Sequence, residues 1–328
     1  MKYIKKRIPL WMLRIAKFVI HGVNLVFYSF YWIKHDLLYS GDSETKESQL
    51  AGLMITSHVL EKGVTMPNRR LGFGYLRVRR IIRQCNDCIS KYGYESVEVQ
   101  STLNDLYEYL HIHESSNFQL PKDIATGIRQ LIKQAHFIGI SFSSIMTKDN
   151  YFKPVMSFEQ FAYQRHSIRN YVNKEIEIDI LYKVFRLAQT APSACNRQSV
   201  RVKVISDKKK KEAVLNLQNG NRGFGYLADK ILLITSEQGA WNYKTRTSAY
   251  LDAGIYTMNL LYALHYYKLC ACTLNCHLSI GEMKKLRKIL DIPTSELPIV
   301  FISVGYAPDQ FMIAKSQRLD IERIIKII

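Results

Sequence analysis

The 328-residue sequence contains little cysteine, little tryptophan and few acidic side chains. Six cysteines are too few to cross-link a chain of this length, so a disulfide scaffold is excluded and a reducing, cytoplasmic compartment is favoured. Only 28 acidic residues oppose 46 lysines and arginines, which gives a formal net charge of +18. This balance favours anionic partners, namely phosphorylated ligands, nucleic acid or an acidic membrane surface, without choosing among them.

A long uncharged apolar run is also missing. Residues 8–33 are mostly apolar, but Arg14 and Lys17 interrupt them. The longest uncharged part, residues 18–33, is shorter than the roughly 20 residues that a membrane-spanning helix needs. No small-residue cleavage site follows, which argues against a signal peptide. Residues 1–35 therefore fit a helix that packs on its own domain or makes peripheral contact with an anionic membrane.

The composition is that of a folded protein, with 47% hydrophobic and 23% charged residues, which excludes disorder as the main state. The spacing of apolar residues divides the chain into two parts. Residues 1–150 form the first, a helical N-terminal extension of unknown role, with the clearest helices expected at 76–89, 101–112 and 122–138. Residues 151–328 are mixed α/β, with helices expected at 158–164, 177–189 and 248–267 and strands at 200–204, 230–235 and 297–306. The helix at 248–267 is apolar on nearly all sides, which places it in a core or at a subunit interface.

A basic segment follows the helix expected at 158–164. Arg165, Ser167 and Arg169 occur at alternate positions, so an extended backbone would point all three toward one ligand. The planar guanidinium group binds two phosphate oxygens at once, and a phosphorylated ligand therefore suits this pattern. By itself the pattern is also that of an ordinary solvated turn.

The loop before the strand at 200–204 is rich in small and amide side chains. It reads A-P-S-A-C-N-R-Q over residues 191–198, with Pro192 fixing the turn. Small residues allow the backbone to approach a flat ring, and Asn196 and Gln198 can hydrogen-bond along its edge. The alternative is an unremarkable helix-to-strand connection.

Taken together, these two segments resemble the nitroreductase family of flavin oxidoreductases. In that family an R-H-S-x-[KR] segment precedes a helix and an A-P-S-x-x-N-x-Q segment follows it, as here. Three later segments keep the family's order: residues 250–254 (Y-L-D-A-G), 302–306 (I-S-V-G-Y) and 315–318 (K-S-Q-R). The resemblance covers residues 158–328. The chain departs from the family after Gln198, where Q-P-W is usual, and at residues 267–271, where L-G-L-G is usual.

The resemblance implies an α+β fold, a three-layer α-β-α sandwich with a central, mostly antiparallel sheet. It also implies a homodimer that binds flavin mononucleotide (FMN) in each of two clefts between the subunits. The cofactor-binding residues would be Arg165, His166, Ser167, Arg169, Pro192, Ser193, Ala194, Asn196, Gln198, Asn221, Leu274, Asn275, Lys315 and Arg318. Among them, Lys315 and Arg318 would complete a phosphate clamp, and Arg169 would place positive charge near N1 and O2 of the flavin. The resemblance requires no catalytic side chain and no metal.

The function implied is an FMN-dependent oxidoreductase that transfers a hydride from NADH or NADPH through the flavin to an electron-poor acceptor, such as a nitro compound or a quinone, by a ping-pong mechanism. An alternative is a flavin-binding family member without general turnover, acting as a partner or a membrane-associated module. Nucleic-acid binding is a further alternative, but only the net charge supports it. A binding surface for single-stranded nucleic acid would interleave aromatic residues with the lysine run at 208–211, and none occur there. A metal site joining Cys85 and Cys88 to the later cysteines competes with the simpler interpretation of buried thiols.

Overall fold

The computed structural model describes residues 9–34, 46–135, 137, 143–154, 157–241, 245, 247–314 and 316–328. Five helices come first: α1 (Leu10–Lys34), α2 (Lys46–Val64), α3 (Tyr75–Tyr92), α4 (Val97–Ser115) and α5 (Lys122–Gln134). The helices predicted at 76–89, 101–112 and 122–138 correspond to α3, α4 and α5, so the helical character of this region is confirmed. Lys315 and residues 1–8 lie outside the described residues.

Helices α2 to α5 enclose a hydrophobic core of their own. In α3 the buried residues Val78, Ile81, Cys85 and Cys88 recur at intervals of three and four, which places them on one face of the helix. They pack against buried side chains of α2, α4 and α5, including Leu60. Burial of this apolar face, rather than intrinsic helix propensity, is what stabilises such helices.

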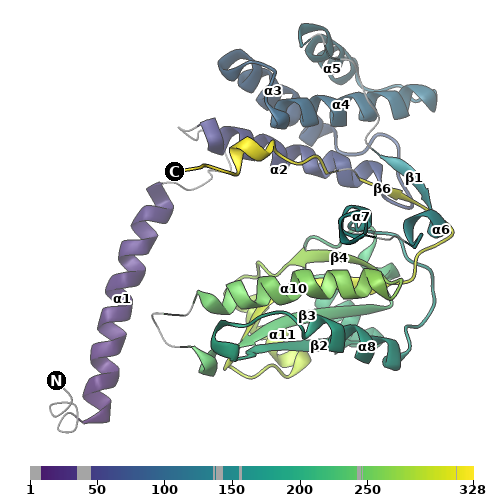
Figure 1. Cartoon of the computed structure of the whole chain (residues 1–328). Helices are drawn as coiled ribbons and strands as arrows, with labels where there is room; N and C mark the ends of the chain where they lie inside the picture. The colour runs from purple at the N-terminus through teal and green to yellow at the C-terminus, as the bar shows by residue number, and fades with distance from the viewer. Residues whose placement is uncertain are drawn as a thin grey trace.

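Helix α1 is different, because apolar side chains along it are exposed. In Figure 1 it extends away from the other helices. The exposed fractions are 62% for Trp11, 79% for Phe18 and 73% for Val26. Among the described residues, no helix has both the length and the apolar character needed to cross a membrane.

The second part of the chain contains a four-stranded antiparallel sheet with the strand order β2-β3-β5-β4. Its strands are β2 (Val200–Ile205), β3 (Lys230–Glu237), β4 (Cys270–Asn275) and β5 (Glu296–Gly305). The central strand β3 is buried along almost its whole length, as expected of a strand covered on both faces. The strands predicted at 200–204, 230–235 and 297–306 are confirmed.

Helices cover both faces of this sheet. Leu232 and Ile234 of β3 pack with α8 (Ile178–Ala188) and α10 (Ser248–Tyr266). Their neighbours Ile231 and Leu233 pack on the other face with α9 (Lys208–Leu217) and α11 (Ile280–Leu290). The period of two along β3 thus separates two hydrophobic clusters. The predicted α+β fold, a three-layer α-β-α sandwich, is confirmed.

Shorter elements complete the fold. Strand β1 (Ser144–Thr147) pairs antiparallel with β6 (Gln310–Ile313), so the end of the first part lies beside a strand near the C-terminus. The remaining elements are α6 (Lys148–Tyr151), α7 (Phe158–Gln164), η2 (Ala194–Asn196), η3 (Gly225–Leu227), η4 (Gln238–Ala240) and η5 (Ile321–Arg323).

The C-terminal segment after β6 returns along α2 (Figure 1). Arg323 of η5 forms an ion pair with Glu98 of α4 at 2.5 Å. From the other side, Met66, just after α2, packs against the core beneath the sheet. The end of α2 therefore lies between the helical region and the α-β-α sandwich.

Candidate cofactor site

A cation-lined cavity in the second part has a volume of about 470 Å³. It lies between the segment that follows α7, one side of α10 and the segment that follows β6. The lining includes Tyr163, Arg165, His166, Ser167, Arg169, Met258, Tyr262, Ser316 and Arg318. Its size falls within the roughly 300–1,000 Å³ typical of small-molecule sites.

The basic segment after α7 is extended and anchored to the sheet. Ile168 is fully buried, and its backbone N–H donates to the carbonyl of Ala271 in β4 at 3.0 Å. Because alternate side chains of an extended backbone point to opposite sides, burying Ile168 leaves Ser167 and Arg169 for the cavity. This local structure brings Arg165, Ser167 and Arg169 to the same cavity, together with Arg318 from 150 residues later in the chain.

The cavity holds positive charge that the described residues do not neutralise. The Nε atoms of Arg165 and Arg169 are buried, and neither has a hydrogen-bond partner among those residues. Burial lowers the pKa of His166, and the positive charges of Arg165 and Arg318 lower it further. A hydrogen bond to the carbonyl of Gln164 acts in the opposite direction and raises this pKa. Since a buried guanidinium nitrogen is costly without an acceptor, this donor set fits a phosphorylated, anionic ligand.

The loop at 191–198 has a strained backbone. Cys195, Asn196 and Gln198 adopt left-handed conformations, with φ of 54°, 53° and 48°. Non-glycine residues seldom adopt this conformation, and it persists only where surrounding contacts enforce it. Ser193 Oγ accepts from the Gln198 N–H at 2.8 Å, and Gln198 Nε2 donates to Asn196 Oδ1 at 3.0 Å. Gln198 therefore holds the side chain of Asn196 in place.

Buried Asp252 of α10 also holds this loop, because its carboxylate accepts from the Ala194 N–H at 3.1 Å. Pro192, Ser193 and Gln198 line a second cavity of about 270 Å³, together with Asp252 and Tyr256. Helix α10 thus borders both cavities. Within one chain, however, the loop does not share the cavity of Arg165 and Arg318, so the predicted convergence does not occur inside a single subunit.

Five of the predicted contact residues that the structure describes line neither cavity: Ala194, Asn196, Asn221, Leu274 and Asn275. Leu274 is buried in the core beneath the sheet, so its side chain is not available to a ligand. Asn221 is also buried, and its Nδ2 donates to the carbonyl of Leu215 in α9 at 2.8 Å. Asn275 is exposed, and its carbonyl accepts from Gln218 Nε2 at 3.1 Å. The latter two contacts shape the loop between α9 and β3.

The cysteines do not assemble into one site. Cys85 and Cys88 are buried in the helical core, and Cys270 and Cys272 are buried in the core beneath the sheet. Burial raises the pKa of Cys85 to about 12, which suits an inert thiol. No cluster of potential metal ligands is found within the described part of the chain.

Sequence reasoning missed several residues at the cavity. Met258 and Tyr262 lie one helical turn apart on α10 and line the same wall, so helical spacing was a usable signal for them. Glu61 of α2 was not anticipated as a site residue, although it accepts hydrogen bonds from Ser316 across 255 positions of sequence. No sequence motif or spacing connects Glu61 with Ser316.

Part of the chain matches a known protein family. Residues 162–221 match the model of the Nitroreductase family, and the match spans the basic segment, α8 and the strained loop. This part of the chain is therefore similar to the Nitroreductase family. The predicted resemblance is thereby confirmed, and the match also includes Asn221 at its end.

Two relatives align with about half of the chain. An iodotyrosine deiodinase from Haliscomenobacter hydrossis is 26% identical over 196 residues, which cover 50% of this chain and 85% of the relative. An NADH dehydrogenase/NAD(P)H nitroreductase from Archaeoglobus fulgidus is 26% identical over 154 residues, covering 46% and 86%. A solved structure of a protein with the same description, from Parabacteroides distasonis, is 21% identical, covers 51% of this chain and 96% of its own, and has a TM-score of 0.46.

Proposed function

We propose that the nitroreductase-like part of the chain binds FMN and transfers a hydride from NADH or NADPH through it to an electron-poor acceptor, a nitro compound or a quinone, by a ping-pong mechanism. The observation that carries this proposal is the cavity in which Arg165, Ser167, Arg169 and Arg318 meet with no carboxylate of the described residues lining it. The family match and the NAD(P)H nitroreductase relative support the same reaction class.

The chain's own residues bind and orient the cofactor. Arg165, Ser167 and Arg318 hold the phosphate, for which the guanidinium groups supply paired N–H donors. Arg169, later in the same segment, places positive charge at the pyrimidine edge of the ring. Tyr163 and Tyr262 add aromatic side chains to the wall of the cavity. Bound FMN supplies the hydride chemistry, and the protein contributes position and electrostatics.

We further propose that the complete site forms between two copies of the chain. Helix α10 carries a stripe of exposed apolar side chains, Leu251, Ile255, Met258 and Tyr266, at intervals of four, three and eight. The stripe runs past both cavities, because Asp252 and Tyr256 border one and Met258 and Tyr262 border the other. A homodimer that buries it would bring the loop at 192–198 of one copy to the cation-lined cavity of the other.

The exposed apolar helix α1 favours one variant of this function, a flavoprotein that works at a membrane surface. Its exposed Trp11 and Phe18 occur with the cationic side chains of Arg14 and Lys17 on the same helix, a composition typical of interfacial helices. In this variant the nitroreductase-like part of the chain acts on an acceptor that resides at or near the membrane.

A visible spectrum and a turnover assay test the proposal. Purified protein should show flavin absorbance, or acquire it on titration with FMN, and should oxidise NADH or NADPH with a quinone or nitroaromatic acceptor. Absence of flavin after FMN titration would remove the proposed function. Tight flavin binding without oxidation of either dinucleotide would instead favour a flavin-binding module without general turnover.

A further inference from the structure

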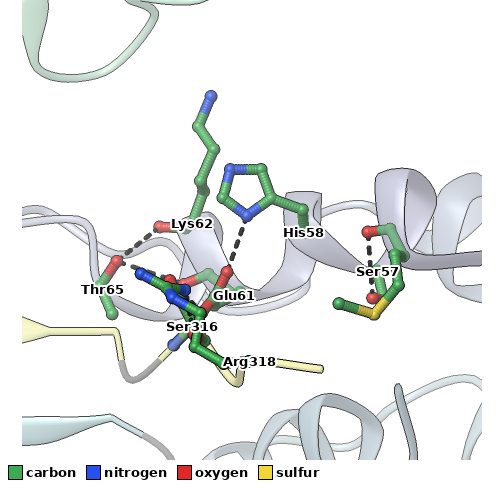
Figure 2. Close-up of polar contacts among 8 residues, drawn as sticks. Ser57, His58, Glu61, Lys62, Thr65, Ser316 and Arg318 are labelled. Atoms are coloured by element: carbon green, nitrogen blue, oxygen red, sulfur yellow. Dashed lines mark hydrogen bonds and ion pairs between the residues drawn. The ribbon is translucent and has the colours of Figure 1, made fainter. Parts of the chain in front are cut away.

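The end of helix α2 lies against the segment that carries Ser316 and Arg318. Figure 2 shows Glu61 between His58 and Ser316. Glu61 Oε1 accepts from both the backbone N–H and the hydroxyl of Ser316, each at 2.9 Å, and Oε2 lies 2.7 Å from His58 Nδ1. Ser316 has a left-handed backbone with φ of 46°, which these two hydrogen bonds stabilise.

Glu61 remains a carboxylate in this position. Burial acts to raise its pKa, but the hydrogen bond and the charge of His58, with the hydrogen bonds from Ser316, outweigh burial and lower it. Ser316 in turn accepts a hydrogen bond from the guanidinium of Arg318 through its carbonyl oxygen. A chain of contacts therefore runs from α2 through Ser316 to Arg318, which lines the cation-rich cavity.

The next residue of α2, Lys62, reaches the other side of the same region. Its Nζ donates to the carbonyl of Gly220 at 3.2 Å, in the loop between α9 and β3. The side chain is half-buried, and burial together with the positive charges of Arg169 and Arg77 lowers the pKa of Lys62. Within the described part of the chain, no carboxylate forms an ion pair with Lys62. A half-buried ammonium beside another cation is unfavourable unless an anion joins them.

We propose that helix α2 completes the cofactor site, with Lys62 binding the pyrimidine edge of the flavin beside Arg169 and Glu61 positioning the Ser316–Arg318 phosphate clamp. This inference rests on the proposed function, since it assigns two further residues to the same site. It gives the N-terminal helical region a role in the nitroreductase-like part of the chain, which the family resemblance alone does not assign to it. Residues of α2 bind and orient the ligand and take no part in proton transfer.

The two roles differ in which part of the flavin they concern, and riboflavin separates them because it lacks the phosphate. Replacing Lys62 removes a contact to the ring, so Lys62→Met should weaken binding of FMN and of riboflavin by the same factor, about tenfold. Because a cation near the pyrimidine edge stabilises the reduced, anionic flavin, the loss should be larger for the reduced than for the oxidised form. Lys62→Arg, which keeps the charge, should retain most of the affinity.

Replacing Glu61 removes support from the phosphate clamp alone. Glu61→Ala should weaken FMN binding about fivefold and leave riboflavin binding unchanged. Glu61→Gln keeps an acceptor oxygen for Ser316 and should show a smaller loss. Matched controls are Lys133→Met in α5 and Glu114→Ala in α4, which remove the same charges from exposed positions of the same helical region.

The assay is a titration of each full-length variant with FMN and with riboflavin, followed by quenching of flavin fluorescence, with thermal unfolding recorded in parallel. Equal affinities for wild type and Lys62→Met would overturn the role of Lys62, and a loss confined to FMN would overturn its placement at the ring. A parallel loss of FMN and riboflavin binding in Glu61→Ala would overturn the positioning role. Wild-type protein that binds neither flavin would instead overturn the proposed function itself.

Discussion

Replacing buried His265 with phenylalanine should make the stability of the protein less sensitive to acid. The imidazole lies among the rings of Tyr151 and Phe161, with both centroid distances at 4.9 Å. Its Nδ1 is buried and has no hydrogen-bond partner among the described residues. Burial, with repulsion from Arg165 and His166, lowers the pKa of His265 to about 4.

The magnitude follows from the difference between the folded and unfolded pKa values. The ordinary value is about 6.5, so below this pH the unfolded chain binds a proton that the folded protein does not, and the folded state loses stability until the pH reaches about 4. The full difference of roughly 2.5 units corresponds to about 3 kcal/mol. Between pH 7.5 and pH 5 the loss due to this one residue is about 2 kcal/mol.

The assay is urea unfolding of wild type and His265→Phe at pH 7.5 and pH 5. The free energy of unfolding of the wild type should fall by about 2 kcal/mol more than that of the variant, because phenylalanine cannot be protonated. Substitution of the exposed His277 by phenylalanine is the control for any effect of removing a histidine. Equal pH dependence of wild type and His265→Phe would refute the reasoning.

Three further predictions follow from the structure. Arg165→Ala should weaken FMN binding by about 10- to 100-fold in a fluorescence titration, since a charge-assisted phosphate contact contributes about 1.5–3 kcal/mol, whereas exposed Arg129→Ala should not change it. Asp105→Asn should raise the melting temperature at pH 7.5 by a few degrees, and this gain should shrink as the pH falls. The reason is that burial and the charge of Glu61 raise the pKa of Asp105 above its ordinary value, although a hydrogen bond from Ser57 acts to lower it. The full chain should sediment with vesicles that contain anionic lipid. Binding to these vesicles should fall in 0.5 M salt, and also when Trp11 and Phe18 are replaced by serine. If the protein sediments equally well with anionic and with neutral vesicles, the interfacial role of α1 is contradicted.

Local patterns predicted most of the sandwich and the basic segment. The period of two along β3 and the three-to-four spacing of apolar residues in α3 each depend on near neighbours in the sequence, which is why their elements could be located. The same holds for Arg165, Ser167 and Arg169, whose alternation becomes a common orientation once the buried Ile168 fixes the extended backbone.

Contacts between distant segments could not be predicted in this way. Glu61 and Ser316 are 255 positions apart, and their hydrogen bonds depend on the return of the C-terminal segment over α2. The burial of Leu274 likewise depends on which face of β4 meets the core. The sequence alone did not decide whether the helix at 248–267 lies in a core or at a subunit interface. The exposed apolar stripe on α10 favours the interface.

Native mass spectrometry of the protein after incubation with FMN tests the central claim most directly, because it counts chains and cofactors in one particle. The account predicts a dimer that carries two FMN molecules, one for each pairing of the cation-lined cavity with the loop at 192–198 of the other copy. Particles that carry no FMN, or a single chain that retains FMN by itself, would contradict it.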